Sequence, residues 1–124
     1  MEIVVMPLNV LIVEDDPGLR TIYQRVLRDT DCNIIETTNA IDALNILETT
    51  TPDVIFLDMM LPQLGGEAVL EHIQNNSGFE NTKIVIVSSN KHFQVYAKQS
   101  AQVEFVLKPI RPDQIRTYVN HAFV

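Results

Sequence analysis

The chain has 124 residues, 46% of them hydrophobic and 20% charged, which is the composition of a globular protein with one domain. Sixteen acidic residues against nine basic ones give a net charge of -7, which argues against binding to the phosphate backbone of nucleic acids. The single cysteine, Cys32, excludes an internal disulfide and a cysteine-based zinc site. No apolar run is long enough to cross a membrane and the start lacks a basic signal region, so we expect a cytoplasmic protein without membrane contact.

Residues 1–7 are expected to be an N-terminal extension, and residues 8–124 a single domain. The first predicted strand, Leu8–Val13, is apolar apart from one asparagine. Asp16 and Pro17 then have the residue types of a helix cap and of a first helical position. The helix that follows is amphipathic, with a core face of Leu19, Ile22, Tyr23, Val26 and Leu27 and an outward face of Arg20, Gln24, Arg25 and Arg28.

The rest of the chain continues to alternate between strands and helices. Asn39 is the expected cap of the second helix, and Pro112 the first residue of the last. The third strand is wholly apolar, which predicts a central strand covered on both faces. The further predicted strands are Cys32–Thr37, Val54–Leu57, Lys83–Val87 and Val103–Leu107. The predicted core faces of the later helices are Ala40, Ala43, Leu44 and Leu47; Val69, Leu70 and Ile73; Phe93, Tyr96, Ala97 and Ser100; and Ile115, Tyr118, Val119 and Ala122.

Five strands alternating with five helices predict right-handed crossovers and a parallel sheet between two helical layers. The expected fold is therefore a single α/β domain, doubly wound and flavodoxin-like, with the strand order 2-1-3-4-5. In this order the switch point, at which the sheet stops growing to one side and starts growing to the other, lies between strands one and three. Folds of this class bind their ligands outside the carboxyl ends of the strands, at that switch point.

Polar residues stand where the apolar runs stop. Glu14 and Asp15 follow the first strand, Asp58 the third, Ser88 the fourth and Lys108 the fifth, so all are expected at one edge of the sheet. Three carboxylates in one cleft repel each other unless they share protons or hold a cation. The residues thus predict a site for Mg²⁺ or Mn²⁺, with Asp58 as a nucleophile for phosphorus. Lys108 and Ser88 would contact the phosphoryl oxygens.

In this order and spacing, the motifs resemble those of the receiver domain of two-component response regulators. The resemblance extends over nearly all of the chain, from Leu8 to Val124. The residues that carry it are Leu11–Pro17, Leu57–Pro62 with the following Gly65 and Gly66, Ser88-Ser89, and Lys108-Pro109.

The resemblance implies that a histidine kinase or a histidine phosphotransfer protein donates a phosphoryl group to Asp58. Magnesium would be held by Asp15, Asp58 and the backbone carbonyl of Met60, and Glu14 would act mainly through metal-bound water. Lys108 would pair with the phosphoryl group, and the Lys108-Pro109 bond is expected to be cis. Beyond its own phosphorylation and dephosphorylation, the domain is not expected to be an enzyme.

The resemblance also implies a switch. Phosphorylation would draw Ser88 inward and let Phe105 swing into the vacated space. The surface formed by the fourth helix, the fifth strand and the fifth helix would then change, to control a downstream protein or form a dimer. Phe105 lacks the hydroxyl of the more frequent tyrosine, and Ser88 replaces the more frequent threonine. Met60 and Asn90, each two residues beyond a site residue, are expected to tune the phosphoryl lifetime.

Other interpretations stay open on the residues alone. Asp58 could cap a turn, Lys108 could be a solvated lysine, and Phe105 could be plain core. A phosphatase would need an acid where Met60 stands, and a flavin-binding module would need a phosphate-binding loop where the acids stand. A receiver that docks partners without being phosphorylated is a third alternative. Because the sequence ends soon after the fifth helix, we expect either a stand-alone receiver or a piece of a longer regulator.

The histidines share no ligand spacing and are expected at the surface or as satisfied side chains: His72, His92 and His121.

Overall fold

A computed structural model of the protein describes residues 7–121. Strands and helices alternate along the chain, with one 3₁₀ turn, η1, before the fourth helix. The elements are β1 (Leu8–Val13), α1 (Pro17–Leu27), β2 (Cys32–Thr37), α2 (Ala40–Leu47), β3 (Val54–Leu57), α3 (Glu67–Asn75), β4 (Lys83–Ser88), η1 (Lys91–Phe93), α4 (Gln94–Gln99), β5 (Val103–Leu107) and α5 (Pro112–His121).

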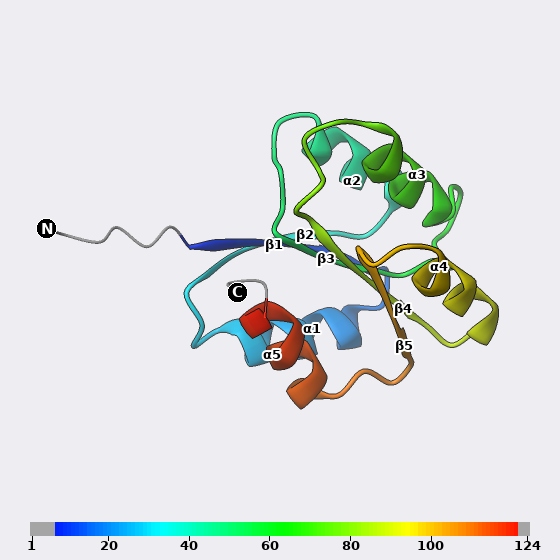
Figure 1. Ribbon diagram of the computed structural model, residues 1–124. Coiled ribbons are helices and arrows are strands. Elements are labelled where there is room, and N and C mark those ends of the chain that lie inside the picture. Colours follow the sequence, from blue (N-terminus) through cyan, green and yellow to red (C-terminus); the bar gives the residue numbers. More distant parts are fainter. Residues whose placement is uncertain (1–6, 122–124) are drawn as a thin grey trace, which may run out of the picture.

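The five strands form one parallel sheet in the order β2-β1-β3-β4-β5, which confirms the predicted flavodoxin-like topology. Helices α1 and α5 cover one face of the sheet, and α2, α3 and α4 cover the other (Figure 1). The last residues of β1 and β3, Val13 and Leu57, are partners across the ladder. The residues that follow these two strands therefore begin side by side at the carboxyl edge.

The core lies in two layers, one on each face of the sheet. Alternate residues of each central strand point to opposite layers, and β3 is buried at every position. On the α1 and α5 face, Tyr23 packs on Phe56 with ring centroids 5.0 Å apart. On the other face, α2 and α3 contribute Ala43, Leu47, Val69, Leu70 and Ile73. The predicted caps are confirmed, since Asp16 accepts from the amide of Gly18 and Asn39 from that of Asp42.

Three local predictions were wrong. Ile22 was expected on the core face of α1 but is 40% exposed, because it lies at the margin of that face, whose other residues are buried against the sheet: Leu19, Tyr23, Val26 and Leu27. Ser100 was expected on the α4 stripe, yet the helix ends at Gln99 after opening with a 3₁₀ turn. Ser88 does not follow β4 but is its last residue, because β5 continues the ladder far enough to pair it with Leu107.

Some expectations lie outside the described residues. These are the predicted packing of Ala122 and the structure of residues 1–6 in the predicted extension. Within residues 7–121, none of the helices combines the length and the apolar character that a membrane span requires.

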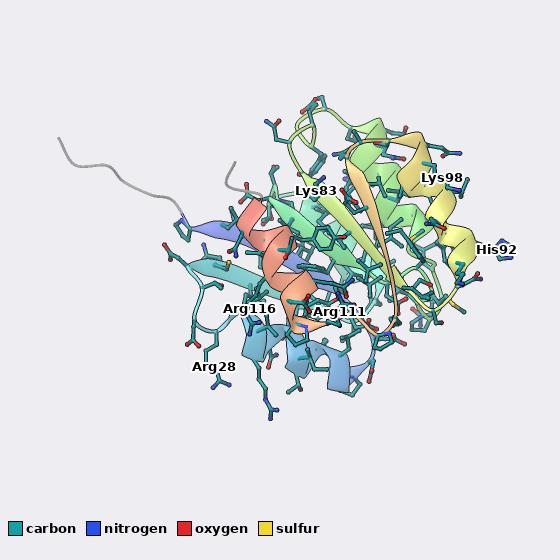
Figure 2. All side chains as sticks on the ribbon, turned by 60° about the horizontal axis from the view of Figure 1, so that its bottom comes forward. Arg28, Lys83, His92, Lys98, Arg111 and Arg116 are labelled. Carbon is teal, nitrogen blue, oxygen red and sulfur yellow. The ribbon has the colours of Figure 1, made fainter. Side chains whose placement is uncertain are left out.

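Charge is distributed unevenly over the two helical layers. Every arginine belongs to, or directly adjoins, α1 or α5, and Figure 2 shows Arg28, Arg111 and Arg116 around these helices, with Lys98 and His92 near α4. Between Arg28 and Lys83 the sequence contains ten aspartates and glutamates and no lysine or arginine. That stretch includes both α2 and α3. The layer of α1 and α5 therefore carries arginines among its acids, while α2 and α3 of the other layer carry acids without a lysine or an arginine.

Gly66 allows the loop after β3 to fold tightly against the end of the strand. Its amide donates to the carbonyl of Met59 at 3.0 Å, and its φ of -62° is accessible to any residue. The constraint is therefore space. A Cβ at this position would lie 2.5 Å from the carbonyl oxygen of Asp58 and 2.8 Å from the Cα of Met59, which are main-chain atoms that cannot move aside.

We predict that Gly66→Ala lowers the free energy of unfolding by about 2 kcal/mol, because the added methyl group overpacks this loop. Gly18→Ala is the matched control. Its Cβ would come no closer than 3.5 Å to the side chain of Asp16, so the stability should be unchanged or raised by less than about 1 kcal/mol. Urea unfolding followed by far-ultraviolet circular dichroism measures both, and equal stabilities of the two variants would contradict the close approach.

Candidate functional site

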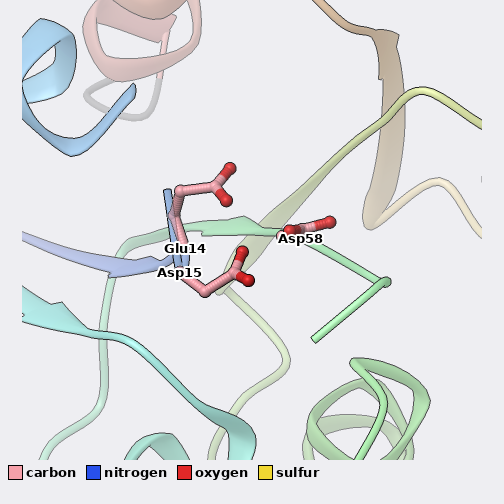
Figure 3. A group of neighbouring side chains, drawn as sticks. All are labelled: Glu14, Asp15 and Asp58. Atoms are coloured by element: carbon pink, nitrogen blue, oxygen red, sulfur yellow. The ribbon is translucent and has the colours of Figure 1, made fainter. Parts of the chain in front are cut away.

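Three carboxylates gather at the carboxyl edge, where β1 and β3 end. Glu14 and Asp15 follow β1, Asp58 follows β3, and one oxygen from each lies within 4.8 Å of the others (Figure 3). The amide of Glu14 donates to the carbonyl of Thr37 at 3.0 Å, and the amide of Asp58 donates to that of Val13 at 3.0 Å. These bonds extend the parallel ladders by one residue. The sheet itself thus places the acids next to each other.

The acids differ in their contact with water. Glu14 is 1% exposed and Asp58 is 4% exposed, whereas Asp15 is open to solvent. Burial raises the pKa of Glu14 from 4.5 to about 7, and the negative charge of Asp58 adds to this, while Lys108 and the amide of Asp16 oppose it. Between pH 4.5 and about pH 7, the carboxyl group of Glu14 keeps its proton in the folded protein but has lost it in the unfolded chain. The free energy of unfolding therefore falls as the pH rises through this window.

Lys108 is the cation of the site. Its Nζ lies 3.0 Å from Oε1 of Glu14 and 3.5 Å from Oδ2 of Asp58. Burial acts to lower the pKa of Lys108, but the bond to Glu14 and the charges of both acids raise it, so the ammonium stays charged. Its amide donates to the carbonyl of Ser88 at 2.9 Å, and the predicted cis bond to Pro109 is confirmed.

The remaining predicted residues surround this cluster. Met60 donates its amide to Oδ1 of Asp58 at 3.0 Å and leaves its side chain 58% exposed. Ser88 is fully buried at the end of β4, and its Oγ accepts from the amide of Asn90 at 3.1 Å. Phe105 pairs with Ile86 across the β4–β5 ladder and is half-buried against the core beneath α3 and α4.

The structure brings some predicted residues into contact and leaves others beside the cluster. Lys108 contacts both Glu14 and Asp58, and an oxygen of Asp15 lies within 4.8 Å of an oxygen of each of these two acids. Asn90 caps the 3₁₀ turn, because its Oδ1 accepts from the amide of His92. Neither His72 nor His92 belongs to a group of potential metal ligands in the part of the chain that the structure describes.

Two residues at the site escaped the sequence analysis. Arg20, predicted to face outward, donates from Nη1 to the carbonyl of Glu14 at 3.0 Å. Tyr23, predicted as core, is buried so close to the acids that burial first, then the charges of Glu14 and Asp58, raise its pKa. Helical spacing could place both side chains on a face of α1, but it carries no information on which main-chain groups they approach.

The donor set suits a hard divalent cation. The carboxylates of Glu14, Asp15 and Asp58 offer only oxygen, which Mg²⁺ and Mn²⁺ prefer. The three acids outnumber the single lysine that contacts two of them. Two surface hollows, by contrast, lie at the opposite edge around Glu80 and Gln102, and neither is lined by such a cluster.

Comparison with known proteins agrees with this geometry. The family model of the response regulator receiver domain matches residues 10–120. The chain is 33% identical over 82 residues to protein PilG of Pseudomonas aeruginosa, covering 66% of this chain and 61% of PilG. It is 26% identical to response regulator Rre1 of Synechocystis, covering 93% of this chain and 51% of Rre1. The chain thus spans about half to three fifths of the length of these two curated relatives.

Solved structures show the same fold. The chemotaxis response regulator CheY4 of Vibrio cholerae superimposes with a TM-score of 0.81 at 19% identity, covering 94% of this chain and 98% of that one. The family match includes all three acids, Ser88 and Lys108 within its bounds. The chain therefore belongs to the family of response regulator receiver domains.

Proposed function

We propose that this receiver domain accepts a phosphoryl group on Asp58 from a histidine kinase or a histidine phosphotransfer protein, and that a bound Mg²⁺ assists the transfer. The observation that supports the proposal most directly is the placement of Asp58 between the amide of Met60 and the ammonium of Lys108, beside two further acids. Membership of the family implies a two-component system. The donor, the metal and the switch described below are our inference.

The transfer moves phosphorus from nitrogen to oxygen. The amide of Met60 engages one carboxylate oxygen of Asp58 and leaves the other, which faces Lys108, free to attack. As this oxygen bonds to phosphorus, the phosphorus–nitrogen bond of the donor breaks, and the imidazole leaves with a proton from solvent. Asp15, Asp58 and the carbonyl of Met60 would hold Mg²⁺, with Glu14 reached through metal-bound water. The cation supplies positive charge for the phosphoryl oxygens.

Lys108 and Ser88 complete the binding of the phosphoryl group. The ammonium of Lys108 would exchange its contact with Asp58 for one with a phosphoryl oxygen, without leaving Glu14. The hydroxyl of Ser88 now accepts from Asn90, and its proton is free to be donated to another phosphoryl oxygen after rotation.

A rotation of Ser88 would change the packing around Phe105. The two residues lie on adjacent strands, and Phe105 is only half-buried, so its ring can move without opening a cavity in the core. Val95 of α4 and Leu107 of β5 are exposed apolar residues on the adjoining surface. We infer that the surface of α4, β5 and α5 contacts a downstream protein or a second copy of the chain once Asp58 is phosphorylated.

Incubation with Mg²⁺ and acetyl phosphate tests the phosphoacceptor. The wild type should gain one phosphoryl group in intact-protein mass, and Asp58→Asn should gain none, since the nucleophilic oxygen is replaced by an amide nitrogen. Asp29→Asn, at an exposed aspartate after α1, is the matched control and should be labelled like the wild type. Equal labelling of Asp58→Asn would remove Asp58 from its role, and turnover of acetyl phosphate without labelled protein would indicate a phosphatase.

Titration calorimetry with Mg²⁺ tests the metal site. Asp15→Asn should weaken binding by at least about tenfold, since even the loss of an outer-shell partner of a metal site has an effect of that size. Asp16→Asn makes the same chemical change one residue further on, where asparagine preserves the helix cap. It should bind Mg²⁺ like the wild type. If both variants bind equally well, Asp15 is not a ligand.

The side chain of Met60 is expected to lengthen the life of the phosphoryl group. It stands exposed beside Asp58, where an apolar chain can cover the phosphoryl group and cannot orient an attacking water. Met60→Asn should therefore shorten the half-life of phosphorylated protein severalfold, measured by mass after removal of acetyl phosphate. An unchanged half-life would exclude shielding by Met60.

A further inference from the structure

The loop that carries Asp15 is held from both sides. Before it, the amide of Glu14 is bonded to Thr37 of β2, and the carboxylate of Glu14 accepts from the amide of Asp16 at 3.2 Å. Behind it, the carbonyl of Asp16 accepts from the amide of Arg20 at 3.1 Å, which is the first turn of α1. Main-chain atoms on either side of Asp15 thus have fixed partners.

Arg20 of α1 makes two hydrogen bonds to this loop, one from its main chain and one from its side chain. Its backbone is bonded to Asp16, and its guanidinium reaches back over six residues to the carbonyl of Glu14 at 3.0 Å. The carbonyl belongs to the peptide unit that joins Glu14 to Asp15. A hydrogen bond to it therefore restrains the rotation of that peptide plane, and with it the direction in which the next side chain leaves the main chain.

Asp15 itself has no such restraint. Among residues 7–121, no hydrogen bond or ion pair to its side chain or its main chain is found, and the residue is exposed. Its carboxylate nevertheless lies within 4.8 Å of those of Glu14 and Asp58. The position of this carboxylate is thus set by the conformation of the peptide units around it.

We propose that Arg20 is a positioning residue for the metal site: by holding the carbonyl of Glu14 it presents the carboxylate of Asp15 to the divalent cation. This inference rests on the proposed function, because it concerns the same cation. It assigns to Arg20 a contact with the main chain of the site and none with the phosphoryl group.

A purely electrostatic role of Arg20 would have the opposite sign. A guanidinium near a cation site repels the cation, so its removal would tighten the binding of Mg²⁺. Loss of a positioning contact weakens binding, because the free protein then samples loop conformations in which Asp15 points elsewhere. The direction of the change therefore distinguishes the two roles.

The experiment compares Mg²⁺ affinity by titration calorimetry in Arg20→Met, Arg20→Lys and Arg25→Met. Methionine keeps an apolar stem without the donor, whereas lysine keeps one donor and the charge. Arg25, an exposed residue in the last turn of α1, provides the matched loss of charge. We expect Arg20→Met to bind Mg²⁺ about tenfold more weakly than the wild type, as for other outer-shell contacts, and Arg20→Lys to recover part of the loss. Arg25→Met should bind like the wild type or slightly more tightly.

Urea unfolding without metal separates these effects from a loss of structure, since Arg20→Met should keep the unfolding midpoint of Arg25→Met. Equal or tighter binding by Arg20→Met would overturn the positioning role. If Arg20→Met does not fold, the Mg²⁺ affinity of Arg20→Lys is compared with that of Arg25→Lys. Weaker binding by Arg20→Lys alone supports the positioning role, and equal binding by the two variants overturns it. If the wild type binds no Mg²⁺, or Asp15→Asn binds it normally, the metal site of the proposed function fails and this inference fails with it. If Asp15→Asn loses binding while Arg20→Met keeps it, only the inference fails.

Discussion

The repulsion among Glu14, Asp15 and Asp58 is the constraint on which the rest of this structure depends. Two of the three carboxylates are almost fully buried, where charges interact far more strongly than in water. Lys108 compensates part of the negative charge, while burial first, and then the charge of Asp58, still raise the pKa of Glu14. A folded chain keeps such a cluster only if the surrounding main chain is too rigid to move the acids apart. Under the proposed function, a bound divalent cation would relieve part of this repulsion.

The rigidity comes from main-chain contacts at the carboxyl edge. Parallel ladders place the ends of β1 and β3 side by side, and the two buried acids, Glu14 and Asp58, are each bonded to a neighbouring strand through their amides. Gly66 lets the following loop fold against Asp58, and Arg20 holds the carbonyl of Glu14 from the other direction. The site is therefore assembled by backbone geometry. Side chains supply its charge, its donors and its access to water.

Much of this arrangement could be predicted from the order of residues. Apolar runs ending in Glu14, Asp58 and Lys108 located the strand ends, and alternation of strands and helices located the common edge, because right-handed crossovers permit few topologies. Contacts that depend on tertiary packing could not be predicted. Helical spacing assigns Arg20 to the outer face of α1 and Ile22 to its core face. Only the packed structure shows that Ile22 is exposed and that Arg20 reaches the carbonyl of Glu14. The pairing of Ser88 with Leu107 likewise depends on how far the neighbouring strand extends.

The uneven distribution of charge over the helical layers gives the molecule an electrical polarity. Arginines occur only around α1 and α5, and α2 and α3 bear acids without a lysine or an arginine. Such an asymmetry produces a field that extends beyond the surface by about a Debye length, roughly 8 Å at physiological ionic strength. An approaching protein with a charged surface experiences a torque in this field and is turned before the two surfaces meet. The order of arginines along the chain thus influences the orientation of encounters, and added salt weakens this guidance even where it leaves the fold intact.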